Sequence, residues 1–411
     1  MGNKYLQSLQ ASKPVPYDQI QLTPFVPYYK LFWHNVSAIF WIYTYTHRDA
    51  PNDLDVSSCG LGNNIHPLIL VPGNGGNQIE VRLDQHYKPK SVWCSSWLCP
   101  IRKKSGEWFR LWFDPSVLLS PFTKCFNKRM ILYYDADLDD YQNAPPVHTR
   151  VCNFGSTKSL LYLNPLLRDA TSYMSHLVKA LEKDSEYVND QTILGAPYDF
   201  SKNEGKPVIL LSHSLGGLFV LHFINRTTPS WRRKYIKHFV ALAAPWGGTV
   251  EKMKTFASGN TLGVPFVNPL LVMPQQRRSE SNQCLRDGKF LEDIGFSEGV
   301  VPNYKTRVLP LTVEVVTPGV PVTCIYGKGF DTPEVLVYGE GGFDEQPEIK
   351  YGDGDGTVNL ASLKALELIH RVESLTTVEI GGVSHTSILK DEIALKEIVK
   401  QISIINEKRA V

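Results

Sequence analysis

One stretch of the chain, residues 206–223, constrains the fold more than any other. Its sequence is KPVILLSHSLGGLFVLHF, and the first half is an unbroken apolar run rich in β-branched residues. Such a run is typical of a strand buried on both faces of a sheet. From Leu215 the stretch continues as an apolar helix, so Ser214 is expected on a sharp turn between strand and helix.

A serine on a strained strand-to-helix turn is typical of the nucleophile of an α/β-hydrolase, where the usual motif is Gly-x-Ser-x-Gly. Small neighbours are needed because the strand and the helix approach each other closely there. Here Ser212 replaces the first glycine, which exchanges one small residue for another. The alternative is an ordinary buried turn whose serine has no chemical role.

Other apolar runs predict strands that alternate with helices, and this alternation indicates a parallel sheet. With the serine turn, it predicts an α/β-hydrolase fold with a mostly parallel sheet. The expected strands lie at about 66–72, 191–195, 238–244, 322–327 and 375–380, and the expected helices at 166–183 and 388–405.

The charge balance and the cysteine spacing exclude some classes of partner. The 411 residues carry 43 Lys and Arg against 41 Asp and Glu, which argues against a nucleic acid held by bulk charge. The seven cysteines include no Cys-x-x-Cys pair, so no metal site is expected. No organic cofactor is implied either.

The N-terminal region, residues 1–65, is expected to be an atypical extension. Residues 1–18 are polar and contain no apolar core of a signal peptide. The aromatic segment 31–45 is interrupted by His34 and Asn35, and it falls short of the ~20 apolar residues of a spanning helix. We expect this segment to be interfacial or buried, with an internal signal anchor as the less favoured alternative.

A glycine-rich loop follows the first predicted strand, in HPLILVPGNGGNQ at residues 66–78. It matches neither Gly-x-Gly-x-x-Gly nor the phosphate-loop motif that ends in Gly-Lys. A loop that exposes backbone N–H groups to an oxyanion also needs glycines. Because the serine turn lies downstream, the oxyanion interpretation is favoured over nucleotide binding.

Serine needs a base to remove its proton, and the base needs an acid to hold its tautomer. In α/β-hydrolases the chain order is serine, acid, histidine. Asp353 and Asp355 lie in the turn-forming sequence YGDGDGTVN, and His385 follows the last predicted strand in GGVSHT. Spacing does not choose between the two aspartates. A solvated turn and a calcium loop are the alternatives, but the later ligands of a calcium loop are absent.

Four tryptophans lie between residues 93 and 112. Amphipathic tryptophans are typical of a membrane–water interface. The alternative is a loop that its aromatic side chains attach to the core.

These motifs resemble the lecithin–cholesterol acyltransferase family, with its plant members and its lysosomal phospholipase relatives. The resemblance runs from about His66 to Ile405 and implies an α/β-hydrolase domain over 66–411. Within it, the family has a membrane-contacting lid, here at about 83–130, and a cap, here shortened, at about 250–315. The shared motifs are HPLILVPGNGGNQ (66–78), RLWFD (110–114), APYDF (196–200), SHSLGG (212–217), APWGG (244–248) and YGDGDGTVN (351–359).

The resemblance implies roles for individual residues. Ser214 matches the nucleophile, His385 the base and Asp355 the acid, which selects Asp355 over Asp353. Backbone N–H groups of Gly75 and Leu215 would form the oxyanion hole.

The resemblance also implies features of the lid. A Cys99–Cys125 disulfide would close it, and Trp97, Trp108 and Trp112 would contact lipid. Cys324 matches a family half-cystine, but no partner cysteine follows it in 360–375.

The chain departs from the family between the APYDF strand and the elbow strand. Only residues 201–205 separate the two, whereas a parallel crossover usually needs a dozen residues and a helix. We expect the absence of this helix to uncover apolar sheet surface beside the elbow strand. The chain should therefore be less stable than a family member that has the helix.

The favoured hypothesis is a lipid acyltransferase or acyl hydrolase that moves an acyl chain from a glycerophospholipid through Ser214 to a sterol, another lipid hydroxyl or water. The expected partners are therefore a phospholipid and a membrane surface. The alternative is a catalytically inactive, membrane-associating variant. A lid disulfide and the sequons at Asn35 and Asn225 favour the secretory pathway, vacuole or exterior, although no N-terminal signal peptide is evident.

Overall fold

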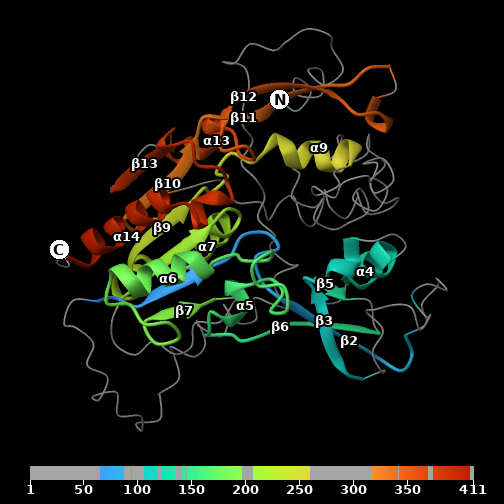
Figure 1. Cartoon of the computed structure of the whole chain (residues 1–411), viewed down its shortest axis with the longest axis horizontal. Helices are drawn as coiled ribbons and strands as arrows, with labels where there is room; N and C mark the ends of the chain where they lie inside the picture. The colour runs from blue at the N-terminus through green and yellow to red at the C-terminus, as the bar shows by residue number, and fades with distance from the viewer. Residues whose placement is uncertain are drawn as a thin grey trace.

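A six-stranded parallel sheet forms the centre of the molecule (Figure 1). The computed structural model describes residues 65–87, 94, 106–118, 122–130, 132–135, 140–143, 146–196, 207–259, 317–340, 342–368 and 374–407. The strand order is β13-β10-β9-β8-β1-β7, and each neighbouring pair is parallel. The strands are β1 (Leu68–Val71), β7 (Ile193–Gly195), β8 (Val208–His213), β9 (Ile236–Leu242), β10 (Val322–Lys328) and β13 (Leu375–Gly381).

This sheet confirms the predicted α/β-hydrolase fold. Two of its adjacent strands, β1 and β8, are buried at every position, as their unbroken apolar sequences predict. Each fully buried Leu or Ile side chain contributes about 1.5–3 kcal/mol relative to exposure. The carboxyl ends of β1 and β8 lie side by side because the strands pair in parallel, with Val71 opposite Ser212. The glycine-rich loop and the serine turn therefore meet at one edge of the sheet.

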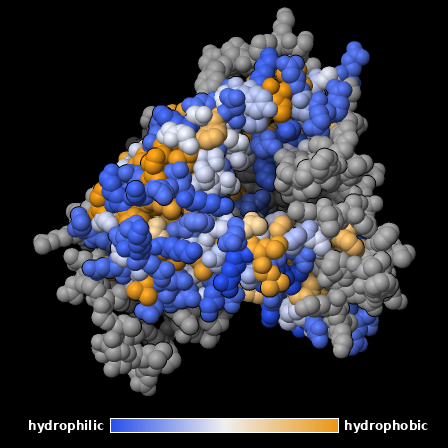
Figure 2. Space-filling view, viewed as in Figure 1, coloured by the Kyte–Doolittle hydropathy of each residue, from blue (hydrophilic) through white to orange (hydrophobic). Residues whose placement is uncertain are grey.

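Helices cover the sheet. The helices α6 (Ser175–Asp184) and α14 (Glu392–Glu407) pack against each other in front of it (Figure 1). The helix α7 (Gly216–Asn225) follows the serine turn and contacts β8 and β1. Shorter helices are α5 (Lys158–Leu161), α8 (Pro229–Tyr235) and α13 (Leu360–Leu363). Figure 2 shows hydrophobic residues at the surface over β10 and α14, where Ile393 is 68% exposed.

The helix predicted over 166–183 is wrong in its first half. Residues 166–174 precede α6, and Leu166 is 91% exposed rather than part of a buried stripe. The side chain of Asn164 accepts a hydrogen bond from the backbone N–H of Leu166, and the hydroxyl of Thr171 donates to the carbonyl of Leu167. These local side-chain bonds favour turns over a helix.

A second, antiparallel sheet includes one strand, β3, from the segment 83–130 that was predicted as a lid. It comprises β2 (Ile79–Leu83), β3 (Trp108–Trp112) and β6 (Val147–Val151), in the order β3-β2-β6. Of its other strands, β6 lies outside that segment and β2 overlaps it only at Leu83. This sheet has a core of its own, formed by Val81, Phe109, Leu111 and Val147. Beside it lie α4 (Phe122–Met130) and the pair β4 (Leu132–Asp135) and β5 (Asp140–Asn143).

The sequence analysis missed an antiparallel hairpin of β11 (Phe330–Val337) and β12 (Glu348–Gly354). It is inserted between β10 and Asp355, and its β11 strand contacts α9 (Val250–Ser258). The sequence YGDGDGTVN was interpreted as a turn, but residues 351–354 belong to β12.

Several predictions lie outside the described residues. They concern the N-terminal segment 31–45, the missing crossover at 201–205, most of the cap, Trp97 and Cys99. The predicted exposure of sheet surface is nevertheless wrong for β1 and β8, which are buried throughout. Among the described helices, none is long and apolar enough to span a bilayer.

The disulfide partner of Cys125 was predicted incorrectly. Cys125 bonds to Cys94, with the two Cα atoms 5.5 Å apart, and not to Cys99. The two candidates lie only five residues apart in a segment whose conformation the sequence does not specify. Cys324 is a free, buried thiol in β10.

Loss of this disulfide should destabilise the protein. The bond closes a loop with a sequence separation of 31. Chain-entropy arguments for a loop of that size give about 3–4 kcal/mol. We expect Cys125→Ser to lower the free energy of unfolding by about that amount, whereas Cys99→Ser leaves it unchanged. Peptide mapping without reduction that links Cys99 to Cys125 would contradict this assignment.

Candidate active site

Ser214 lies on a strained turn between β8 and α7. Its φ is +55°, in the left-handed region that side chains other than glycine rarely adopt. Such a conformation costs about 1–3 kcal/mol and persists only when the surroundings fix it. Here the Ser214 N–H donates to the carbonyl of Leu242 at 2.8 Å, and its own carbonyl accepts from the Gly217 N–H at 2.9 Å.

Close contacts explain the small residues around the turn. A Cβ added at Gly216 would lie 2.5 Å from the carbonyl oxygen of Pro72, and one at Gly217 would lie 2.5 Å from the Cβ of Ala244. A Cβ at Gly73 would lie 2.9 Å from the Cβ of Ser214. The loop after β1 and the turn after β8 thus touch each other directly.

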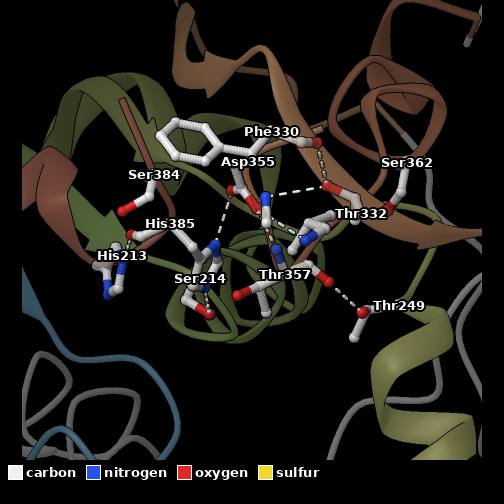
Figure 3. A network of polar contacts seen from close by, with 12 residues as sticks. His213, Ser214, Thr249, Phe330, Thr332, Asp355, Thr357, Ser362, Ser384 and His385 are labelled. Atoms are coloured by element: carbon white, nitrogen blue, oxygen red, sulfur yellow. Dashed lines mark hydrogen bonds and ion pairs between the residues drawn. The ribbon is translucent and has the colours of Figure 1, made fainter. Parts of the chain in front are cut away.

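The structure brings Ser214, His385 and Asp355 together, and Figure 3 shows their side chains pointing toward one another. The Nε2 atom of His385 lies 2.8 Å from Oγ of Ser214. Its Nδ1 atom lies 2.7 Å from Oδ2 of Asp355. Because an ionised carboxylate only accepts, Nδ1 carries the proton and the Ser214 hydroxyl donates to Nε2.

Asp355 is fully buried, and its remaining hydrogen-bonding capacity is used by the backbone. Its Oδ1 accepts from the N–H groups of Thr357 at 3.0 Å and Val358 at 2.7 Å. Its carbonyl oxygen also accepts from the His385 N–H at 2.8 Å. The acid and the base are therefore joined through both backbone and side chain.

Asp353 has a different environment. It is exposed on β12, and its Oδ1 accepts from the Gly329 N–H at 2.8 Å. Residues two positions apart on a strand point to the same face. However, β12 ends at Gly354, so Asp355 lies beyond the strand and does not have to share the face of Asp353. Of the two aspartates that spacing left open, Asp355 is the one that bonds to His385.

The predicted oxyanion donors lie on the two segments that meet at this edge of the sheet, the loop after β1 and the start of α7. Leu215 is the residue before α7, so its N–H is among those that a helix start leaves unpaired. Gly75 adopts a φ of +68° in the loop after β1. Among the described residues, neither backbone N–H has a hydrogen-bond acceptor.

Trp112 and Trp108, which were predicted to contact lipid, lie on β3 and have partners inside the protein. The indole N–H of Trp112 donates to the carbonyl of Gly75 at 2.8 Å. Trp108 lies between two guanidinium groups, with Arg150 at 4.2 Å and Arg82 at 5.1 Å from its ring centre. Trp112 thereby connects the β3-β2-β6 sheet to the predicted oxyanion loop.

Two residues beside the site were not recognised from the sequence as part of it. Tyr173 was assigned to an apolar helical stripe, and His213 was treated only as part of the motif around Ser214. In the structure, the Tyr173 hydroxyl lies 2.9 Å from Nδ1 of His213, and Nε2 of His213 lies 2.9 Å from the carbonyl of His385. Nothing in the spacing of Tyr173 predicts this position.

The pKa of His213 is lowered to about 3, mainly by burial and in addition by the nearby His385. The imidazole of His213 is therefore neutral near neutral pH. Burial also lowers the pKa of His222 to about 3, with a contribution from Arg226.

In the described part of the chain, no group of three His, Cys, Asp or Glu side chains is placed to hold a metal ion.

Comparison with known proteins gives consistent relatives. The profile of the family "Lecithin:cholesterol acyltransferase" matches residues 199–291. Lecithin-cholesterol acyltransferase-like 1 of Arabidopsis thaliana is 70% identical over 404 residues, covering 85% of this chain and 92% of that protein. Lysosomal phospholipase A and acyltransferase of Canis lupus familiaris is 34% identical, covering 80% and 89%. Human phosphatidylcholine-sterol acyltransferase is 29% identical, covering 82% and 85%.

The two aspartates provide a matched pair for a test of the site. Asp355→Asn replaces an acceptor of the His385 Nδ1–H by an amide, and in a serine triad such a change lowers kcat by about 10⁴-fold. Asp353→Asn should leave kcat within about twofold, because this exposed side chain bonds only to Gly329. Kinetics on a soluble ester would measure both, and equal losses would contradict the assignment.

The buried His213 should make stability depend on pH. Between about pH 3 and 6.5 the unfolded chain binds a proton at this position that the folded chain does not, so stability falls as pH falls through that window. The slope amounts to at most about 1.4 kcal/mol per pH unit for one group. Urea unfolding at several pH values should give a shallower slope for His213→Gln, and an unchanged slope would refute the assignment.

Proposed function

The chain belongs to the lecithin:cholesterol acyltransferase family, and from this premise we propose that it moves an acyl chain from a glycerophospholipid, through an ester on Ser214, to a lipid hydroxyl or to water. It is an enzyme of the acyltransferase or phospholipase type. The observation that carries the proposal is the hydrogen-bonded series Ser214–His385–Asp355 at 2.8 and 2.7 Å.

In the first half-reaction, Oγ of Ser214 attacks the ester carbonyl and its proton passes to Nε2 of His385. The bond between the carbonyl carbon and the glycerol oxygen then breaks, and His385 returns the proton to that leaving oxygen. A lysophospholipid departs and the acyl group remains on Ser214. Asp355 holds the imidazole in the correct tautomer and stabilises its charged form.

In the second half-reaction, a hydroxyl group or water gives its proton to His385 and attacks the acyl-Ser214 ester. The acyl–Oγ bond breaks and Ser214 recovers the proton. The backbone N–H groups of Gly75 and Leu215 would bind the oxyanion in both halves. The start of α7 adds a favourable dipole there.

The choice between transfer and hydrolysis depends on how well water is excluded from the acyl intermediate. A sterol is one acceptor that the family relationship favours, since the human relative is a phosphatidylcholine-sterol acyltransferase. The shortened cap predicted from the sequence favours water. Phospholipid and a membrane surface are the proposed partners, with Trp97, Trp108 and Trp112 as proposed lipid contacts.

The second candidate is an inactive variant, motivated by the short connection at residues 201–205. The buried strands β1 and β8 and the short distances at Ser214 favour an assembled site.

A secretory or vacuolar location is proposed from the lysosomal relatives. Of the two sequons, Asn225 ends α7 with its Nδ2 atom buried, so it is a poor glycan acceptor.

Vesicles of phosphatidylcholine labelled in the acyl chain would test the proposed function. With sterol in the vesicles, we expect label in fatty acid, in steryl ester or in both, and none with Ser214→Ala. A fluorophosphonate probe should form an adduct on Ser214 of the wild-type protein. Folded protein that neither labels nor turns over would reject the proposal in favour of the inactive variant.

A further inference from the structure

A chain of hydrogen bonds joins the predicted oxyanion loop to the backbone of the predicted base. The backbone N–H of Gly73 lies 2.8 Å from the hydroxyl oxygen of Tyr173. That hydroxyl lies 2.9 Å from Nδ1 of His213, and Nε2 of His213 lies 2.9 Å from the carbonyl oxygen of His385. The series thus connects the loop after β1, the last residue of β8 and the segment after β13.

The chemistry of the groups fixes the direction of each bond. A carbonyl oxygen only accepts, so Nε2 of His213 carries the proton and donates to His385. The neutral imidazole then has its lone pair at Nδ1, to which the Tyr173 hydroxyl donates. The Tyr173 oxygen in turn accepts from Gly73. Every donor and acceptor along the series is used once.

The series also remains in one protonation state. The low pKa of His213, about 3, keeps its imidazole neutral, and burial raises the pKa of the Tyr173 phenol above its ordinary value. Protonation of His213 would place a donor at both ring nitrogens, so the Tyr173 hydroxyl could no longer donate to Nδ1 and the direction of that bond would have to reverse. The groups that face His213 are the Tyr173 hydroxyl and the ring of His385, whose centre lies 5.1 Å away.

Packing adds to the hydrogen bonds. A Cβ added at Gly76 would lie 2.6–2.8 Å from ring atoms and the hydroxyl of Tyr173. A Cβ at Gly73 would lie 3.3 Å from Nδ1 of His213. The glycines of this loop are therefore needed to admit Tyr173 and His213, in addition to any role in exposing N–H groups.

We propose that Tyr173 and His213 are positioning residues, which hold the loop 73–76 and the backbone of His385 at fixed places relative to Ser214. The inference rests on the proposed function of Ser214 and His385. The His385 backbone is held at both ends of the residue, because its N–H donates to Asp355 and its carbonyl accepts from His213. Its imidazole can then reach both Ser214 and Asp355 without a search for the right backbone position.

Tyr173→Phe tests the proposal, since it keeps the ring and removes only the hydroxyl. Misplacement by about 1 Å can lower a rate about 10²-fold, so we expect kcat to fall about 10- to 100-fold with KM within about twofold. Hydrogen–deuterium exchange should rise in peptides that contain residues 73–78 and 383–387. His213→Gln, which retains an N–H donor toward His385, should keep more activity than His213→Leu.

Tyr187 supplies the matched control at the opposite end of β1. Its hydroxyl also donates to a carbonyl, that of His66 at 2.8 Å, and accepts from a side chain, Nδ2 of Asn406 at 3.1 Å. Tyr187→Phe therefore removes an equivalent hydroxyl far from Ser214. We expect a similar loss of thermal stability in both variants, with kcat and loop exchange unchanged in Tyr187→Phe.

Each outcome decides the proposal. An unchanged kcat in Tyr173→Phe, or equal losses in both tyrosine variants, would overturn it in favour of a purely structural role. If the wild-type protein has no activity, the proposed function fails separately. Hydrogen exchange then decides alone, and unchanged exchange at both loops in Tyr173→Phe would reject the positioning role.

Discussion

The strained backbone at Ser214 is the constraint on which the rest of the site depends. A positive φ at a residue other than glycine is unfavourable, and only fixed neighbours on both sides maintain it. Here β8 is buried along its length before the turn, and α7 is packed on β8 and β1 after it. The cost of the turn is thus offset by burial in the sheet, and the hydroxyl is presented at the sheet edge where His385 can reach it.

Much of this arrangement follows from the sequence because it depends on local patterns. An unbroken apolar run predicts a doubly buried parallel strand, and the small residues from Ser212 to Gly217 predict a close approach at the turn. The chain order of serine, acid and histidine on successive strand ends then predicts that the three side chains meet. Ser214, Asp355 and His385 each come shortly after the end of a strand, and the structure brings these three residues together.

Other features could not be predicted, for physical reasons that differ from case to case. The helix expected from residue 166 was displaced because the side chains of Asn164 and Thr171 bond locally to the backbone. The partner of Cys125 depends on the path of a segment with no periodic pattern. Tyr173 could not be linked to His213 because their contact joins residues 40 apart in the chain, and an aromatic residue at helical spacing is ordinarily a core residue.

The loop that is predicted to bind the oxyanion is held from two directions. On the side of the main sheet, Gly73 donates to Tyr173. On the side of the β3-β2-β6 sheet, Gly75 accepts from Trp112, whose strand β3 pairs with β2 only a few residues after the loop. In the proposed mechanism, a loop fixed in this way would stabilise the oxyanion without reorganisation during the reaction. The residue whose carbonyl accepts from Trp112 is also the one whose N–H is proposed to bind the oxyanion, so a shift of β3 would be expected to move the proposed oxyanion site. In the proposed mechanism, the protection of the acyl intermediate from water and the binding of its oxyanion would therefore not be independent.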